Sequence, residues 1–470
     1  MEPRVKYVFD TLFMAAGVEL RFESVPPRDA PWLLYAPIET WGRPEPHRVA
    51  IAHYADAWTF FEGHSDAAVA EDWCGHRLVV PGSIGEVGRA GDVAADLVAN
   101  AFYFLASWAE RRGADRSGNR RLFRGSVFDR LSVPQDVVDG YLREILEALR
   151  VRAARLGEGE YSATLWPDKR AYAVVLSHDV DFLPMGIVGA LGQGAKTLLR
   201  HLIRRRRPVE AIGALGGLIK ALASGRDAYG CIPEIIAREK SVGVRSSFQV
   251  AVAKEHANDV NYSIQDDAVR DYLKIIMEEG FDLCLHGSYH SAEHVGRYVA
   301  EADLLATRLA RPRGSRQHFL SFDYDTLFTA QERAGIRYDM SIGFPDKPGP
   351  RAGFSYPYFP YCLAEDRPYD VVEISLFLMD ATLSGYLNLS SEEAESVIGS
   401  VLDGLRTKGG CASVVWHPIV FGGARDPGYD RLYWDMVTRI AKSGGLATDG
   451  RTANDLWRAR ALHYASFSSG

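Results

Sequence analysis

The sequence has few cysteines, no long hydrophobic run and no excess of basic residues. Its five cysteines are far apart, odd in number and form no C-x-x-C pair, so they are typical of reduced core residues rather than of a disulfide or zinc framework. The most apolar stretch, residues 97–109, is well short of the roughly 20 residues that a membrane span needs. The 54 Lys and Arg residues are outnumbered by 61 Asp and Glu, which argues against a nucleic-acid partner.

The remaining composition is that of a soluble globular protein. Residues 1–18 lack both a basic start and a small-residue cleavage site, and Asp10 interrupts their apolar pattern, so we expect no signal peptide and a cytoplasmic location. Hydrophobic residues make up 47% and charged residues 24% of the chain. A length of 470 residues then suggests two unequal domains.

A change of pattern near residue 165 predicts the domain boundary. Residues 1–165 mix amphipathic helical stretches with short apolar runs, which predicts a smaller N-terminal α+β accessory domain. From 166 to 470, short apolar strands alternate with helical segments, as in parallel β/α units. We expect the strands at Ala171–Leu176, Arg245–Val252, Phe281–Leu285, Arg337–Ile342, Val371–Leu378 and Ala412–Trp416, with a further one near Leu446. We expect the helices at Ile232–Glu239, Asp267–Glu278, Glu293–Leu309, Asp325–Ala334, Ser391–Leu405 and Tyr429–Ala441.

Such a sheet, barrel-like or doubly wound, carries its functional residues at the carboxyl ends of its strands. Two segments interrupt the pattern. Residues 183–226 form a predicted basic helical insertion, in which 198–207 combines apolar residues with Arg204–Arg207. This part suits peripheral contact with an anionic membrane or a clamp for a phosphate-bearing glycan carrier, and a solvated basic face is the alternative. Residues 343–361 hold five prolines and six aromatic residues, which would either stack on sugar faces or pack against one another.

Polar residues with catalytic chemistry follow several of the predicted strands. Asp179 and Asp181 come after the first, and His286 and His290 directly after the third. If a helix begins at His286, the i, i+4 spacing puts both imidazoles on one face. One carboxylate with two imidazoles is a common ligand set for a hydrolytic divalent metal. Each motif alone has a structural alternative, such as a helix cap or a satisfied buried histidine.

Three further residues complete the series in chain order: Arg316, then Asp380, then His417, which follows the last clear strand. With these motifs in this order, residues 171–470 resemble the polysaccharide deacetylases, carbohydrate esterase family four. The resemblance implies a distorted (β/α) barrel. Residues 1–165 also resemble the domain that precedes this deacetylase type in bacterial surface-polysaccharide gene neighbourhoods.

The resemblance implies a role for each motif residue. Asp179 is the general base, and Asp181 binds the metal with His286 and His290, although the roles of the two aspartates could be reversed. The metal would be Zn²⁺ in the first place, with Fe, Co, Ni or Mn as alternatives. Arg316 would keep the base ionised, although Arg316-Gln317-His318-Phe319 lacks the proline of the family motif.

By the same resemblance, His417 is the general acid and Asp380 orients it. The expected reaction is removal of an acetyl group from an N-acetylated sugar or glycan precursor. Hydrolysis of a non-sugar amide or a cyclic ureide on the same scaffold is the alternative, and a catalytically inactive binding protein is the third interpretation.

Overall fold

The computed structural model describes residues 2–23, 27, 30–43, 45–63, 70–80, 92–112, 126–155, 165–183, 186–225, 228–229, 231–252, 254 and 256–468. It divides into two compact units. The first consists of residues 1–165, 350–369 and 457–470, and the second of 166–349 and 370–456. Two later segments, 350–369 and 457–470, thus belong to the same unit as the N-terminal residues. Positions 184, 185 and 226 of the predicted insertion lie outside the described residues.

The first unit combines helices with short strand pairs. Its helices are α1 (Pro3–Ala16), α2 (Ala55–Thr59), α3 (Leu97–Leu105), α4 (Trp108–Arg112), α5 (Val127–Arg130) and α6 (Val137–Arg155). Parallel strands β1 (Trp32–Ala36) and β2 (Arg48–Ala52) pair with each other, as do the antiparallel pairs β3 (Glu71–Trp73) with β4 (His76–Leu78) and β10 (Tyr361–Cys362) with β11 (Arg367–Pro368). The unit is thus α+β.

Aromatic packing explains why 350–369 belongs to this unit. The ring of Tyr361 lies 4.7 Å from that of Tyr7 and 5.2 Å from that of Phe102. Ser355 donates from its main-chain N–H to Asp139 of α6 at 3.0 Å. Five aromatic residues of the segment are buried: Phe354, Tyr356, Tyr358, Tyr361 and Tyr369. In 350–361 the aromatic side chains therefore pack within the unit, which favours that alternative over stacking on a sugar.

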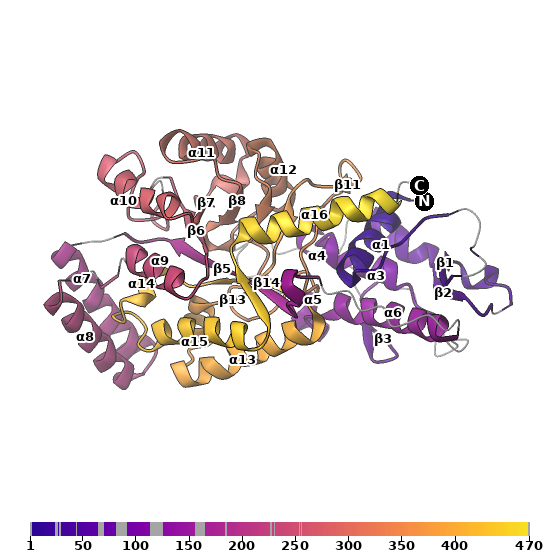
Figure 1. Cartoon of the computed structure of the whole chain (residues 1–470), viewed down its shortest axis with the longest axis horizontal. Helices are drawn as coiled ribbons and strands as arrows, with labels where there is room; N and C mark the ends of the chain where they lie inside the picture. The colour runs from indigo at the N-terminus through magenta and orange to yellow at the C-terminus, as the bar shows by residue number, and fades with distance from the viewer. Residues whose placement is uncertain are drawn as a thin grey trace. The chain divides into compact units, whose positions relative to one another are not determined.

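The second unit is a distorted parallel barrel (Figure 1). Its strands are β5 (Tyr172–Val180), β6 (Ser247–Val250), β7 (Asp282–Gly287), β8 (Gly314–Gln317), β9 (Tyr338–Asp339), β12 (Val372–Glu373), β13 (Leu376–Met379), β14 (Cys411–Val415) and β15 (Gly445–Thr448). All pairings in this sheet are parallel. β12 pairs with β9, and β13 pairs with β14. A single bridge between Leu376 of β13 and Gly343, four residues beyond β9, brings the two ends of the curled sheet together. The predicted barrel is confirmed.

Helices cover the outside of this barrel. They are α9 (Ile232–Ser241), α10 (Asp267–Glu278), α11 (Val295–Arg308), α12 (Tyr324–Ala334), α13 (Ser391–Lys408), α14 (Pro418–Phe421), α15 (Tyr429–Lys442) and the start of α16 (Gly450–Ser468). A large core cluster joins β5 and β14 to α13 and α15, through residues such as Val174, Val414, Leu402 and Tyr433. Ser390 and Glu393 form a capping box at the start of α13.

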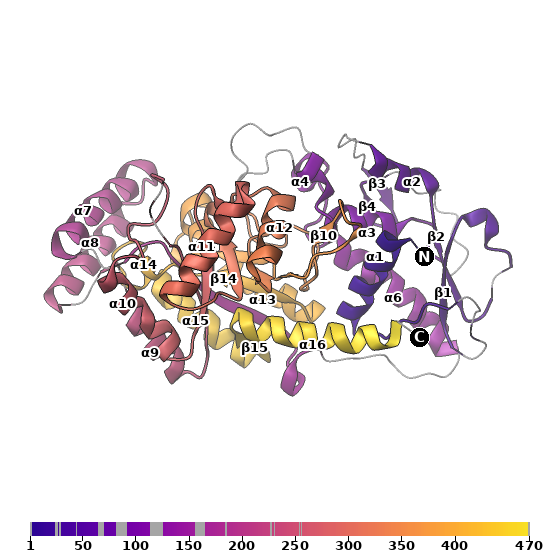
Figure 2. The same cartoon turned by 90° about the horizontal axis from the view of Figure 1, so that it is seen from above.

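Two features of the barrel differ from the sequence prediction. β8, which ends directly after Arg316, was not predicted as a strand because Gly-Ser-Arg-Gln contains no apolar residue. β7 continues to Gly287, so no helix begins at His286. The insertion after β5 is helical as predicted: α7 (Gly186–Leu199) runs into a π-helix (Arg200–Arg204), and α8 (Pro208–Ala223) lies beside α7 (Figure 2).

Candidate metal-dependent active site

The carboxyl ends of the barrel strands bring the polar residues together, as parallel strands do. Asp179 is the second-last residue of β5, and Asp181 follows that strand. His286 lies near the end of β7 and Arg316 near the end of β8. Asp380 follows β13, and His417 follows β14 by two residues. Of the residues predicted from the sequence, His290 alone lies outside the group of side chains described below.

Asp179 and Arg316 form a buried ion pair. Nη1 of Arg316 donates to Oδ1 of Asp179 at 2.6 Å, and Nε of Arg316 donates to the carbonyl oxygen of Met340 at 2.9 Å. Burial acts to raise the pKa of Asp179, but the charges of Arg316, His286 and His417 outweigh it, and the pKa is lowered. Asp179 is therefore an ionised carboxylate held in a fixed orientation.

Asp181, His286 and His318 form a group with the geometry of a metal site. One potential ligand atom from each lies within 4.8 Å of the others. Oδ1 of Asp181 is 3.4 Å from Nε2 of His286 and 3.5 Å from Nε2 of His318. Oδ1 of Asp181 and Nε2 of His286 are buried and make no hydrogen bond. Buried polar atoms are rarely left without a partner, so the donor set fits a bound cation.

Neighbouring groups orient both imidazoles for this role. Nδ1 of His286 is 2.9 Å from the carbonyl oxygen of Arg316 and donates to it, which leaves the lone pair of Nε2 directed at Asp181. Nδ1 of His318 lies 3.7 Å from Oδ1 of Asp259, while its Nε2 faces Asp181. In each imidazole, Nδ1 thus lies beside an acceptor oxygen, and Nε2 faces Asp181.

His318 takes the place in this group that the sequence analysis gave to His290. The helix that would have aligned His290 with His286 is absent, because β7 continues to Gly287 and a turn follows. His290 instead has a side chain that is 42% exposed, with Nδ1 3.7 Å from Oε2 of Glu293. Its ring packs edge-on against His256, with centroids 5.1 Å apart.

His318 and Asp259 were not identified from the sequence. The available signal was the position of His318, two residues after Arg316 in the segment compared with the family's arginine motif. The backbone there is unusual: Phe319 and Leu320 have φ values of 59° and 53°, which non-glycine residues rarely adopt. Such outliers cluster at functional sites, where surrounding structure enforces them.

His417 faces the same group from the end of β14, the strand that pairs with β5. Nδ1 of His417 is 2.6 Å from Oδ1 of Asp380, and its main-chain N–H donates to Oδ2 of Asp380 at 3.2 Å. Nε2 lies 3.6 Å from Oδ2 of Asp181. Burial acts to lower the pKa of His417, but the carboxylates of Asp380, Asp181 and Asp179 outweigh it and raise the pKa to about 9. The arrangement can present a proton on Nε2.

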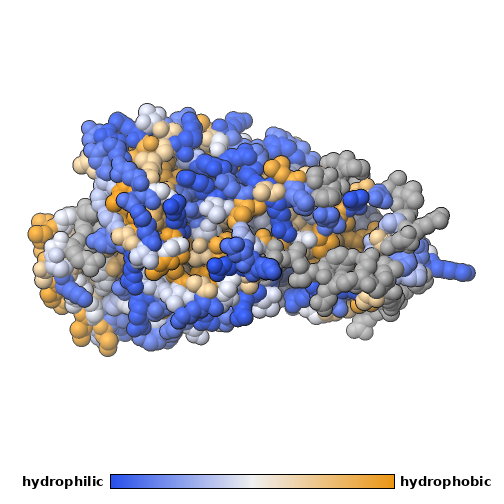
Figure 3. All heavy atoms as spheres, viewed as in Figure 1, coloured by the Kyte–Doolittle hydropathy of each residue, from blue (hydrophilic) through white to orange (hydrophobic). Residues whose placement is uncertain are grey.

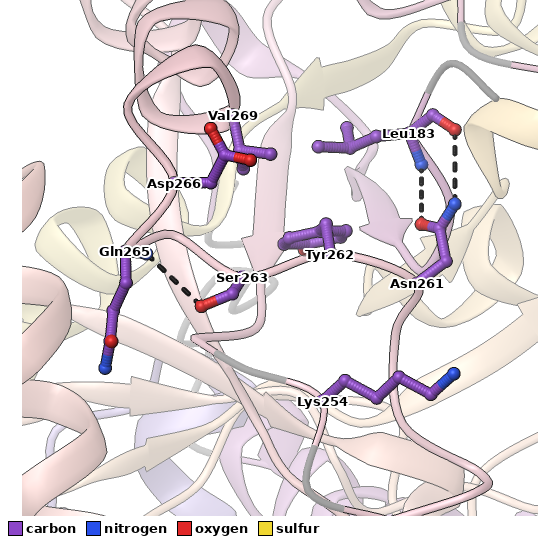
Figure 4. Close-up of a pocket in the computed structure, with 8 residues that line it drawn as sticks. All are labelled: Leu183, Lys254, Asn261, Tyr262, Ser263, Gln265, Asp266 and Val269. Carbon is purple, nitrogen blue, oxygen red and sulfur yellow. Dashed lines mark hydrogen bonds between the residues drawn. The ribbon is translucent and has the colours of Figure 1, made fainter. Parts of the chain in front are cut away.

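A surface cavity of about 470 Å³ lies beside the segment that follows β5 (Figure 4). Asn261 lines it and bonds to both main-chain groups of Leu183, accepting at 3.0 Å and donating at 3.4 Å. The main-chain N–H of Asn261 also donates to the carbonyl oxygen of Asp181 at 3.4 Å. Lys254 and Asp266 add charge to the lining, which suits a polar ligand.

No family model and no curated protein matches the sequence. Solved structures do match it. A polysaccharide deacetylase from Mycobacterium smegmatis, described as putative in its own name, is 17% identical, with 63% of this chain and 93% of that chain covered and a TM-score of 0.42. The Puue allantoinase is 12% identical, with 64% and 95% covered and a TM-score of 0.41.

A probable polysaccharide deacetylase from Pseudomonas aeruginosa is also 12% identical, with 65% of this chain and 97% of that chain covered and a TM-score of 0.40. Because these identities and TM-scores are low, the fold of this chain is assigned from its own strand pairing and not from its superposition on these structures. Polysaccharide deacetylases are among the solved structures to which this chain is similar.

Proposed function

We propose that the chain is a metal-dependent amide hydrolase that removes the acetyl group from an N-acetylated sugar or glycan precursor. The observation that carries the proposal is the pair of unsatisfied buried atoms, Oδ1 of Asp181 and Nε2 of His286, beside the Asp179–Arg316 ion pair. A ligand set, a fixed carboxylate and a proton-bearing imidazole within one group of strand ends are the parts that amide hydrolysis needs.

Asp181, His286 and His318 would hold the metal, with His318 in place of His290. When bound there, a divalent cation supplies a Lewis acid that lowers the pKa of water and polarises an amide carbonyl. Zn²⁺ suits one carboxylate and two imidazoles, and Fe, Co, Ni and Mn are the alternatives to be tested.

Asp179 takes up a proton from the attacking water. Its ion pair with Arg316 keeps it anionic and leaves Oδ2 on the side of the ligand group, 4.0 Å from Nε2 of His286. The guanidinium charge of Arg316 balances the charge of the Asp179 carboxylate, whereas the Asp181 carboxylate lies among imidazoles. This difference supports Asp179 as the base and Asp181 as the ligand. This is the assignment that the family resemblance implies.

His417 donates its Nε2 proton to the amine that leaves. An amine is a poor leaving group until it is protonated, and Asp380 holds the imidazole so that Nε2 points toward Asp181. The water oxygen forms the new bond to the carbonyl carbon, the C–N bond breaks, and the products are acetate and a free amino sugar. The cavity beside Asn261 is the proposed place for the polar remainder of the substrate.

The test has two parts. Metal content is measured on protein purified without chelator, and acetate release is then followed over N-acetylated monosaccharides, nucleotide sugars and oligosaccharides, with Zn²⁺, Fe²⁺, Co²⁺, Ni²⁺ or Mn²⁺ added to the metal-free chain. We expect one metal per chain and acetate from at least one sugar. A chain that opens a cyclic ureide and releases no acetate would favour the alternative amidohydrolase, and a chain without metal or turnover would overturn the proposal.

A further inference from the structure

The α7–α8 hairpin, defined as residues 186–223, carries most of the exposed large apolar side chains in the described part of the chain. Of fifteen such residues, ten lie on it: Ile187, Val188, Leu191, Leu199, Leu202, Ile203, Val209, Ile212, Leu215 and Ile219. Val188 and Val209 are 86% and 80% exposed. Figure 3 shows hydrophobic side chains at the left edge, where Figure 1 places α7 and α8. So many exposed apolar side chains on one hairpin are typical of an interaction site.

Small residues already fill the inner face of the hairpin. Ala190, Gly194, Ala211 and Ala214 are buried. A Cβ at Gly194 would lie 2.4 Å from Cδ2 of Leu218, so the two helices are in tight contact there. The ten exposed apolar side chains therefore do not take part in the packing of α7 against α8, because other positions form that interface.

The hairpin is also attached firmly to the barrel. A Cβ at Gly217 of α8 would lie 2.4 Å from the carbonyl oxygen of Gly423, in the turn that follows α14. Arg200 and Arg205 donate to Oδ1 of Asp426 at 3.0 and 2.5 Å. The exposed apolar face is thus held on a rigid support, near the strand ends that carry Asp181 and His417.

These contacts change the interpretation of the arginine run. Arg205 is buried on Asp426, and Arg207 pairs with Glu210 at 2.9 Å and with Glu393 at 3.0 Å. The run therefore does not act as four free charges. The exposed cations are instead spread over the hairpin: Lys196, Arg204, Arg206 and Lys220.

Charge decides which partner suits this surface. Glu210 is the one acidic residue in 183–225, and Arg207 pairs with it. An apolar helical face with exposed cations and no free acid is the pattern of a helix that lies in the interface of an anionic bilayer. A protein partner of mixed charge would meet no complementary acid here.

The hairpin would lie in the bilayer surface and not cross it. No helix among the described residues is long and apolar enough to span a membrane. The 14 residues of α7 and 16 residues of α8 rise only about 21 and 24 Å, against a hydrocarbon core of about 30 Å.

We propose that the α7–α8 hairpin docks the protein on an anionic phospholipid bilayer, with its apolar face in the interface and its lysines and arginines at the lipid headgroups. The proposal is independent of the proposed reaction. It places the candidate active site beside a membrane, because the hairpin begins five residues after Asp181 and rests on the turn after His417.

The test is co-sedimentation of the full chain with vesicles of phosphatidylcholine alone and of phosphatidylcholine with phosphatidylglycerol. We expect binding to the anionic vesicles that weakens as salt is added. The apolar variant carries Val188→Ser, Ile203→Ser and Ile212→Ser, and should bind at least about tenfold more weakly. The charge variant carries Lys196→Gln, Arg204→Gln and Lys220→Gln, and should lose its preference for phosphatidylglycerol.

The matched control replaces three exposed apolar residues outside the hairpin, Val242→Ser, Leu387→Ser and Leu462→Ser. It should bind as the unmodified chain does. All substituted positions are exposed, so thermal unfolding should be unchanged in each variant. Failure of the unmodified chain to bind anionic vesicles, or equal binding by the apolar variant, would overturn the proposal. A dimer in solution that the apolar variant dissociates, without vesicle binding, would assign the face to a second copy of the chain.

Discussion

Arg316 is bonded to Asp179 through its guanidinium group and to His286 through its main-chain carbonyl oxygen. The first contact is 2.6 Å long and the second 2.9 Å, and all three residues are buried. One residue of β8 thus fixes the proposed base and one proposed metal ligand. The side chain and the main chain can be separated experimentally, because a substitution removes only the first contact.

Replacing Arg316 by Met should abolish turnover and leave metal binding largely intact. The variant keeps the carbonyl oxygen that orients His286 but leaves the Asp179 carboxylate buried without its partner. Breaking a buried ion pair in this way costs about 3–5 kcal/mol of unfolding free energy. Denaturant unfolding, metal analysis and kcat/KM measure the three effects. Loss of metal together with activity would show that the guanidinium group also supports the ligands.

His318→Ala should lower metal affinity by more than about 100-fold, since it removes one of the three proposed metal ligands. His290→Ala is the matched control, because its exposed ring lies outside the ligand group. Competition with a chromogenic chelator measures both. The reverse result, with loss of metal only in His290→Ala, would restore the ligand set inferred from the sequence.

Asp259→Asn should weaken metal binding by about 10- to 100-fold without removing a ligand. Oδ1 of Asp259 faces Nδ1 of His318 across 3.7 Å, and Asp259 also accepts from the main-chain N–H groups of Tyr289 and His256. An asparagine keeps its shape and loses the charge that fixes the imidazole. The same chelator assay applies. Unchanged affinity would show that His318 needs no support from this carboxylate.

Asp179→Asn and His417→Ala should keep the metal and lose turnover by about 10²- to 10⁴-fold, the usual contribution of a general base or acid. Both residues lie beside the proposed ligands and are assigned to proton transfer. Metal analysis and acetate release from the same preparations measure the two properties. Metal loss in Asp179→Asn would mean that Asp179 and Asp181 exchange roles.

Glu239→Gln should destabilise the barrel by about 1–3 kcal/mol and leave metal binding unchanged. Glu239 is buried between β5 and α15, where Oε1 is 3.1 Å from Nε2 of His178 and Tyr433 donates to the same oxygen. Ser246 donates to Oε2 at 2.7 Å. His178, although it directly precedes Asp179, is thus part of the packing between β5 and α15. Thermal unfolding and metal content check the expectation, and a drop in metal content would contradict it.

Much of the barrel follows from local sequence. Apolar strands such as Tyr172–Val180 and amphipathic helices such as Asp267–Glu278 have periodicities that neighbouring residues define. β8 does not, because its polar residues are buried only through partners distant in the chain. Ser315, for example, accepts from Tyr298 at 2.7 Å and donates to Asp339 at 2.9 Å. Such hydrogen bonds exist only in the folded barrel.

The sequence by itself determined that acidic and imidazole side chains follow successive strands, because strand ends can be located from apolar runs. Only the tertiary structure decided which histidine joins Asp181 and His286. That choice depends on where β7 ends and on the turn that carries His318, and neither is encoded by spacing alone. The arginine run shows the same limit, since Arg205 finds its partner in Asp426, more than two hundred residues away.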